Sequence, residues 1–369
     1  MPALRVRDHA PTVRLLALCP ALALVSAACA DDPIEPLPDT GVVPPDTGNY
    51  VPPDAGHQTL DASAEDLGPL DAGFRDPDIW LDDHSEVHGL RTHIKIVGAT
   101  TSTMPPAIFA ADGPGLSHEY LLPHLKALMP GRILVFYDMR GTGTTSYGDL
   151  TGTSTLTARR HADDLAELID FLADRIDTTK VDLVGHGYGA GIAALYAGAH
   201  PERVSRLVLI TPYPAHIDEL VDSQGEFNRR MTSPQRERFM ALLNQHECFQ
   251  NDSRCYLQVF DTIGANAMCP QNRNLWSELH FEFGSFRTLW FVETQLKDSR
   301  FDWRPSLRNI TASTTVIGGA CDSHPAAVAA TYATEIAGAR LITMDDSGRY
   351  PFVESPVTFF GHLGRALMR

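Results

Sequence analysis

The stretch that decides the fold is "VDLVGHGYGAG", residues Val181–Gly191. Its apolar start is typical of a buried strand, and the glycines at positions 185, 187 and 189 predict a tight turn. The residues that follow, "IAALYAGA", are small and apolar and predict a closely packed helix. The stretch therefore predicts a strand, a sharp turn and a helix, with Gly187 at the centre of the turn.

Similar strand patterns recur on both sides of this stretch and alternate with helical patterns. The strand-like segments include "PAIFAA", "RILVFYD", "VSRLVLITP", "STTVIGG" and "ARLITMD". The segment "LTARRHADDLAELIDFLADRI" has apolar residues at helical spacing. This alternation predicts an α/β fold with a mostly parallel central sheet and helices on both faces. Residues 84–213 and 306–369 form the expected core, and residues 214–305 an inserted, mainly helical cap.

Five polar or glycine-rich loops follow the predicted strands. In an open parallel sheet the binding crevice lies beyond the carboxyl ends of the strands, so these loops should meet there. They are "DGPG" (Asp112–Gly115), "DMRGTG" (Asp138–Gly143), "GHGYG" (Gly185–Gly189), "GGACD" (Gly318–Asp322) and "DSGRYPF" (Asp346–Phe352).

Taken in order, these loops resemble those of the α/β-hydrolase fold, and within it the prolyl-iminopeptidase-like group. That group has His-Gly-Gly-Pro-Gly, Asp-X-Arg-Gly-X-Gly and Gly-X-Ser-X-Gly, then a cap, Gly-X-X-Asp and a Gly-His-X-Pro-Phe loop. The resemblance covers about residues 86–369 and is weak only in the cap. It implies acyl transfer by a serine, a histidine and an acid.

The resemblance places the three catalytic positions at Gly187, Arg349 and Asp322. The acid is retained as Asp322, but the nucleophile position is Gly187, which has no side chain. Arg349 stands where the histidine is expected, and a permanently protonated arginine is no general base. We expect Arg349 to pair with Asp322, and the missing serine side chain to enlarge the floor of the pocket.

The oxyanion-hole positions implied by the resemblance are Asp112, Gly113 and Tyr188. The loop reads "ADGPG" where "HGGPG" is usual. A carboxylate at Asp112 would lie where negative charge must develop, which is adverse for acyl transfer.

Residues 1–28 have the pattern of an export signal, with early arginines and then the apolar run "LLALCPALALVSAA". The sequence "VSAAC" resembles a bacterial lipoprotein processing site, which implies lipidation of Cys29. Anchoring to the membrane of the cell envelope would follow, in particular to an outer membrane, facing the periplasm or the surface. The alternative is an ordinary secretory signal with a chance cysteine.

Residues 29–83 read as an acidic tether rich in Pro, Asp and Gly. Residues 30–83 contain 14 acids and one arginine, a net charge of −13 in a chain of −16. Such a segment has few core-forming residues and is expected to stay open. The remaining domain is mildly acidic, so nucleic acid is not an expected partner.

Four cysteines lie beyond the signal and the lipidation site: Cys248, Cys255, Cys269 and Cys321. In an exported protein they allow two disulfides in three connectivities, or some remain buried thiols. Their spacing matches no zinc motif, so neither a metal nor another cofactor is expected.

Two functions are compatible with these patterns. The first is a non-catalytic binding protein that holds a small apolar or peptide-like ligand, or a protein, under the cap. The second is an active hydrolase, a peptidase or esterase, with a non-standard catalytic constellation.

Overall fold

The computed structural model describes residues 79–98, 102, 104–125, 128, 131–147, 156–176, 178–243 and 252–368. The chain divides into two compact units, Met1–Arg75 and Asp76–Arg369, and the described residues belong to the second. The expected signal, Cys29 and residues 30–78 of the tether lie outside the described residues. Within the described part, no helix is both long and apolar enough to cross a bilayer.

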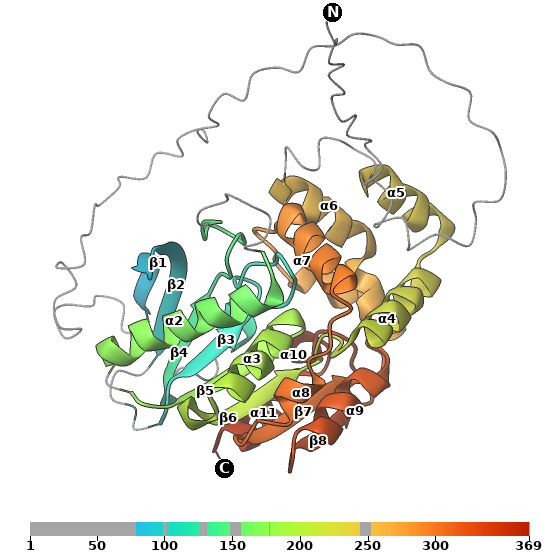
Figure 1. Ribbon diagram of the computed structural model, residues 1–369. Helices are drawn as coiled ribbons and strands as arrows, with labels where there is room; N and C mark the ends of the chain where they lie inside the picture. The colour runs from blue at the N-terminus through green and yellow to red at the C-terminus, as the bar shows by residue number, and fades with distance from the viewer. Residues whose placement is uncertain are drawn as a thin grey trace, which may run out of the picture. The chain divides into compact units, whose positions relative to one another are not determined.

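An eight-stranded sheet in the order β1-β2-β4-β3-β5-β6-β7-β8 forms the centre (Figure 1). Strand β2 is antiparallel to β1 and β4, and the strands from β4 to β8 are parallel to one another. The predicted, mostly parallel α/β sheet is therefore confirmed. The strands are β1 (Ile79–Val87), β2 (Leu90–Gly98), β3 (Ala107–Ala110), β4 (Ile133–Tyr137), β5 (Val181–His186), β6 (Val204–Ile210), β7 (Ser313–Gly319) and β8 (Arg340–Met344).

Strand β1 corrects the boundary of the expected tether, because residues 79–83 lie in the sheet. Its sequence, "IWLDDHSEV", lacks the apolar run of the central strands, so its composition resembles that of the acidic segment before it. As an edge strand it pairs with β2 alone, where Asp82 lies opposite Lys95 and bonds to its ammonium group at 2.6 Å. Such an edge position tolerates charged side chains.

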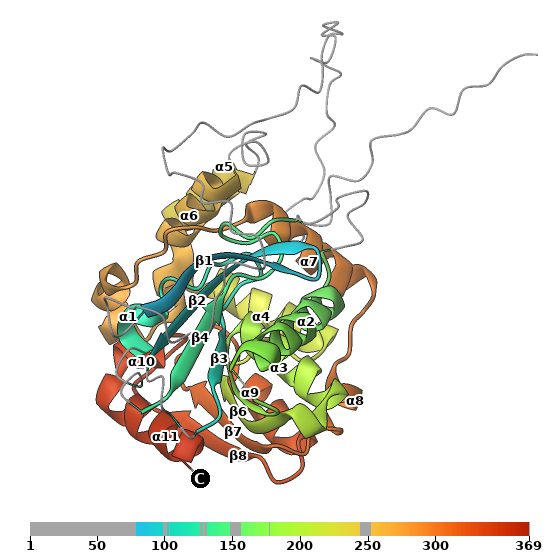
Figure 2. The ribbon, with the colours of Figure 1, turned by 90° about the vertical axis from the view of Figure 1, so that its left-hand side faces the viewer.

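Helices cover both faces of the sheet, as Figure 2 shows. One face carries α2 (Ala158–Ile176), α3 (Tyr188–Ala199), α8 (Arg304–Leu307) and α9 (Ala326–Glu335), and the other carries α1 (Leu122–Leu125), α10 (Pro351–Glu354) and α11 (Pro356–Met368). Strands β3, β4 and β5 are buried throughout because helices pack on both of their faces.

The close packing of helix α3 explains why "GIAALYAGA" is rich in small residues. A Cβ atom at Gly191 would overlap the ring of Trp303, and one at Gly198 would overlap the backbone of Ser306. Glycine at both positions lets α3 approach the segment around α8 closely, which fixes the direction in which α3 leaves the turn at Gly187.

The segment between β6 and β7 contains a group of helices that rises at the upper right of Figure 1. These are α4 (Ile217–Arg230), α5 (Ser233–Leu243), α6 (Asp252–Ile263) and α7 (Phe286–Asp298), with the 3-10 helices η6 (Gly264–Ala267) and η7 (Pro270–Glu278). A short 3-10 helix, η4 (Pro201–Arg203), precedes β6. Residues 214–305, which the sequence assigns to a cap, include all of α4 to α7.

Candidate functional site

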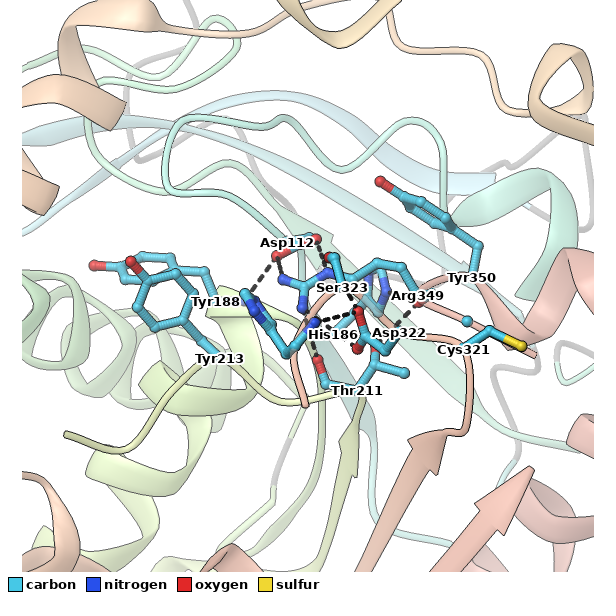
Figure 3. Close-up of polar contacts among 12 residues, drawn as sticks. Asp112, His186, Tyr188, Thr211, Tyr213, Cys321, Asp322, Ser323, Arg349 and Tyr350 are labelled. Carbon is cyan, nitrogen blue, oxygen red and sulfur yellow. Dashed lines mark hydrogen bonds and ion pairs between the residues drawn. The ribbon is translucent and has the colours of Figure 1, made fainter. Parts of the chain in front are cut away.

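Four of the residues singled out from the sequence meet beyond the carboxyl ends of the parallel strands. Figure 3 shows three of them, Asp112, Asp322 and Arg349. Gly187 directly follows β5, and Asp112 follows β3. Asp322 lies on the loop after β7, and Arg349 on the loop after β8. The order of loops read from the sequence thus brings these positions together.

The turn at Gly187 has a conformation that favours glycine, with φ 56° and ψ −118°. Its amide donates to the carbonyl of Ile210 at 2.9 Å, and its carbonyl accepts from Tyr213 at 2.9 Å. The place of a side chain is already filled: a Cβ atom would overlap the carboxylate of Asp112 and lie 2.7 Å from Nη2 of Arg349. The expectation that glycine enlarges the pocket floor is therefore wrong.

The carboxylate of Asp112 takes the two hydrogen bonds expected of an oxyanion hole. Its Oδ1 accepts from the backbone amides of Gly113 and Tyr188, each at 2.8 Å. In the α/β-hydrolase arrangement, the amide after the nucleophile and an amide of the loop after β3 hold the reaction's oxyanion. Here the carboxylate of Asp112 is itself the anion that these two amides bind. The sequence predicts only an adverse charge near the oxyanion hole, whereas in the structure Asp112 occupies both of its donors.

Arg349 forms a two-point ion pair with the same carboxylate. Its Nε donates to Asp112 Oδ2 at 2.9 Å and its Nη2 to Oδ1 at 2.8 Å, in a bidentate arrangement. The pair expected with Asp322 is only a single contact, Nη1 to Oδ2 at 3.6 Å. The principal partner therefore differs from the expectation, because the loop after β3 places its carboxylate in the space that serine would occupy.

The pKa values of the carboxylates of Asp112 and Asp322 are shifted in opposite directions. Burial alone would raise the pKa of Asp112. The positive charge of Arg349 and the hydrogen bonds that the carboxylate accepts instead lower this pKa to about 2. Burial raises the pKa of Asp322 to about 6, against the weaker attraction of Arg349. Burial opposes the charge of Arg349, yet the two carboxylates raise the pKa of the guanidinium above its ordinary value. Arg349 is therefore a fixed cation and Asp112 a fixed anion.

His186, immediately before the turn, is a buried structural residue. Its Nδ1 lies 2.6 Å from the hydroxyl of Tyr120, and its Nε2 lies 2.8 Å from the carbonyl oxygen of Arg349. Burial lowers the pKa of His186 to about 4, so the ring is neutral at pH 7. Its contacts hold the backbone of the Arg349 loop in place.

A disulfide and a cap arginine hold the loop of Asp322. Cys269 of the cap is bonded to Cys321, which selects one of the three connectivities. Cys255 is also disulfide-bonded, and Cys248 lies outside the described residues. Arg230 of α4 donates to the carbonyl oxygens of Cys321 and Asp322 at 2.6 and 2.7 Å.

Two of these supporting residues are not apparent from the sequence motifs. The hydroxyl of Tyr120 accepts from the amide of Asp112 at 2.8 Å and also contacts His186, and Arg230 reaches the site from the cap. Neither belongs to a loop that resembles a family motif. The completed arrangement pairs an anion with a cation. Position 187 itself carries no hydroxyl, and Arg349, at the position of the histidine, has no lone pair with which to accept a proton.

Comparison with known proteins agrees with this geometry at the level of fold. The structure is similar to that of a proline iminopeptidase-related protein from Thermus thermophilus, with a TM-score of 0.59 and 19% sequence identity. That similarity covers 79% of this chain and 96% of the other chain. At this identity the similarity concerns the fold.

Two curated relatives are similar over about a third of this chain. A putative carbamate hydrolase RutD from Rhizobium rhizogenes is 34% identical over 131 residues, 35% of this chain and 43% of the relative. A proline iminopeptidase from Lactobacillus helveticus is 34% identical over 124 residues, 33% of this chain and 40% of the relative. The chain thus matches less than half the length of either protein.

A family model covers much more of the chain. The model of the alpha/beta hydrolase family matches residues 87–361, which include the whole sheet except the first eight residues of β1. With the sheet order and the strand–turn–helix at Gly187, this match shows that the chain belongs to the alpha/beta hydrolase family.

Proposed function

We propose that this chain is a non-catalytic member of the family whose acyl-transfer site is closed by an internal ion pair. The observation that carries the proposal is the position of Asp112. Its carboxylate accepts the hydrogen bonds of the Gly113 and Tyr188 amides and fills the space beside Gly187. A substrate carbonyl would need those donors and that space.

The chemistry of the missing groups supports the same proposal. Removal of the serine of such a triad lowers turnover by about 10⁶-fold, and the remaining rate depends on the oxyanion hole and on binding. Here the amides of the oxyanion hole are engaged by Asp112, and Arg349 has no lone pair to accept a proton. Hydrolysis close to the uncatalysed rate is the expected result.

Binding is the function that remains for such a fold, and we propose a small apolar or peptide-like ligand, or a protein, at the cap. Aromatic rings of cap and core pack against one another here: Phe281 lies 5.2 Å from Tyr120 and from Trp276, centroid to centroid, and Trp276 lies 5.7 Å from Tyr350. Such rings provide apolar surface for a ligand when the cap moves. Native mass spectrometry of the full chain purified from its own cell envelope tests this, since a mass equal to the bare chain alone would contradict it.

Attachment to the envelope membrane through lipidated Cys29 is part of the proposal, and it rests on the sequence "VSAAC". Metabolic labelling with palmitate tests it. The wild-type chain should incorporate label and partition into detergent, whereas Cys29→Ser should do neither. Equal labelling of both chains would contradict the assignment of Cys29.

The loss of acyl transfer is tested with a fluorophosphonate probe and with ester, prolyl-amide and carbamate substrates, because the relatives named above are a proline iminopeptidase and a putative carbamate hydrolase. The wild-type chain should remain unlabelled and should not exceed the buffer rate. Stoichiometric labelling of any serine, or turnover through an acylated chain, would overturn the proposal in favour of a hydrolase with a non-standard constellation.

Reconstruction gives a sharper form of the same test. The variant Gly187→Ser with Arg349→His supplies a nucleophile and a base but leaves Asp112 in the oxyanion hole, so it should stay inactive. Adding Asp112→Gly frees the two amides and the space, and that triple variant is the one in which labelling should appear. Labelling of the double variant to the same extent as the triple variant would show that Asp112 does not close the site.

A further inference from the structure

A second cluster of titratable side chains lies beside β4, away from Gly187. It consists of His93 on β2, His118 and Glu119 on the loop after β3, and Asp138 directly after β4. One potential ligand atom from each of the four side chains lies within 4.8 Å of the others. Sequence motifs do not reveal this cluster, because its members are far apart in the chain and follow no metal-binding spacing.

Asp138 is the centre of the cluster. Its Oδ1 lies 2.8 Å from Nδ1 of His118, and its Oδ2 lies 3.3 Å from Nδ1 of His93. The side chains of Asp138 and His118 are 0% and 1% exposed, and that of His93 is 16% exposed. The carboxylate thus joins two imidazoles in a largely buried position, which solvent reaches at His93.

Hydrogen bonding within the cluster does not account for the carboxylate of Glu119. Its Oε2 is buried and has no hydrogen-bond partner among the described residues. A buried carboxylate oxygen without a donor is unfavourable, since it has lost water and gained nothing in exchange. A cation among the four side chains would satisfy it.

The surroundings of His93 resemble the outer contacts of a metal ligand. Its other ring nitrogen, Nε2, lies 3.1 Å from Oδ1 of Asp82. Metal-bound histidines commonly direct their second nitrogen to a carboxylate, which fixes the orientation of the ring. Asp82 in turn bonds Lys95 at 2.6 Å, so this carboxylate is itself held in place.

We propose that His93, His118, Glu119 and Asp138 form a zinc site. Two imidazoles and two carboxylates are ligands that suit Zn²⁺, and four protein ligands make a closed, structural site. The ligand atoms of tetrahedral zinc are roughly 3.3 Å apart, so the four side chains need to move inward by about an ångström. The ion replaces the hydrogens of the two separate contacts between the imidazole Nδ1 atoms and Asp138. Each of these protons moves to Nε2 of its own ring or is released to solvent, so that both Nδ1 atoms offer a lone pair to zinc.

The place of this site in the fold gives the ion a structural role. It would join β2 and the end of β4 to the loop after β3, and that loop also carries Asp112. The proposal does not depend on whether acyl transfer is lost.

The test uses the untagged full chain, stripped with a chelator and titrated with zinc chloride by calorimetry. We expect one zinc per chain with a dissociation constant at or below about 1 μM, together with a higher melting temperature. X-ray absorption at the zinc edge should show nitrogen and oxygen ligands, including imidazole. Absence of binding, or sulfur among the ligands, would overturn the proposal.

Variants distinguish this site from zinc bound elsewhere. Glu119→Gln and His93→Gln should each weaken zinc binding at least about tenfold, and the exposed control His280→Gln should leave it unchanged. Glu119→Gln is nearly isosteric and alters an oxygen without a partner, so its metal-free fold should be retained by circular dichroism. Zinc affinity unchanged in both cluster variants would contradict the assignment.

Discussion

Asp112 and Asp138 occupy comparable places in the fold, because each lies just beyond the carboxyl end of one of two adjacent parallel strands, β3 and β4. Both carboxylates are buried, and both accept backbone amides as well as charged or chargeable side chains. The difference lies in the partner. Asp112 meets the guanidinium of Arg349, whereas Asp138 meets the imidazoles of His93 and His118.

This difference decides what each site can do. An arginine keeps its charge at every accessible pH and fits both carboxylate oxygens, so the ion pair at Asp112 persists at every accessible pH. Imidazole can lose its proton and then offers a lone pair, so the Asp138 site is able to exchange a proton for a metal ion. The same edge of one sheet thus holds a permanent ion pair beside a cluster suited to binding.

Asp112→Asn and Asp138→Asn are a matched pair that tests this comparison, and Asp112→Asn should have the larger effect. It leaves the buried cation of Arg349 with the 3.6 Å contact to Asp322 as its remaining charge partner, which should cost about 3–5 kcal/mol. Asp138→Asn should cost about 1–3 kcal/mol, because it weakens hydrogen bonds to two imidazoles but does not remove the charge partner of a permanent cation. Urea denaturation of both variants measures the difference, and equal losses would break the comparison.

Asp322→Asn should stabilise the protein in a pH-dependent way. The folded pKa of about 6 lies above the ordinary 3.8, so the folded state holds a proton that the unfolded state releases between these values. The stability associated with Asp322 therefore falls as pH rises through this window, by at most about 3 kcal/mol. The asparagine variant should gain about that much at pH 8 and nothing near pH 3. A loss of stability at pH 8 would show that the contact with Arg349 outweighs burial.

Gly187→Ser should destabilise the chain by about 1–3 kcal/mol, because its side chain overlaps Asp112 and crowds Arg349. Gly89→Ser is a matched control: φ is 82° at Gly89, and a Cβ atom there meets nothing within 4 Å. The difference between the two variants in thermal denaturation isolates the crowding from the backbone strain. Equal losses would mean that the space beside Gly187 is open.

Much of the fold follows from the sequence because it depends on local patterns. The buried strands are apolar runs, the turn at Gly187 has closely spaced glycines, and the order of loops predicts which positions meet. Local patterns do not predict strand β1, because its sequence contains charged residues that a strand tolerates only at the edge of the sheet, here beside β2. The cap interrupts the strand–helix alternation and is visible for that reason.

The site was only partly predictable. The sequence identifies Gly187 and Arg349 as altered positions and Asp322 as the retained acid, but the partner it predicts for Arg349, Asp322, is not the principal one in the structure. That choice depends on side-chain directions: Asp112 reaches the Tyr188 amide and two guanidinium nitrogens at once. The cluster around Asp138 was missed for a similar reason, because only the folded sheet brings His93 and His118 together.

A double-mutant cycle between Asp112→Asn and Arg349→Met tests the ion pair that closes the site most directly. Free energies of unfolding are measured for the wild-type chain, both single variants and the double variant at pH 7. The account predicts that the double variant is more stable than the sum of the single losses implies, with a coupling of about 2 kcal/mol or more. Losses that add to within about 0.5 kcal/mol would show that the two side chains act independently, and would contradict a site closed by their pairing.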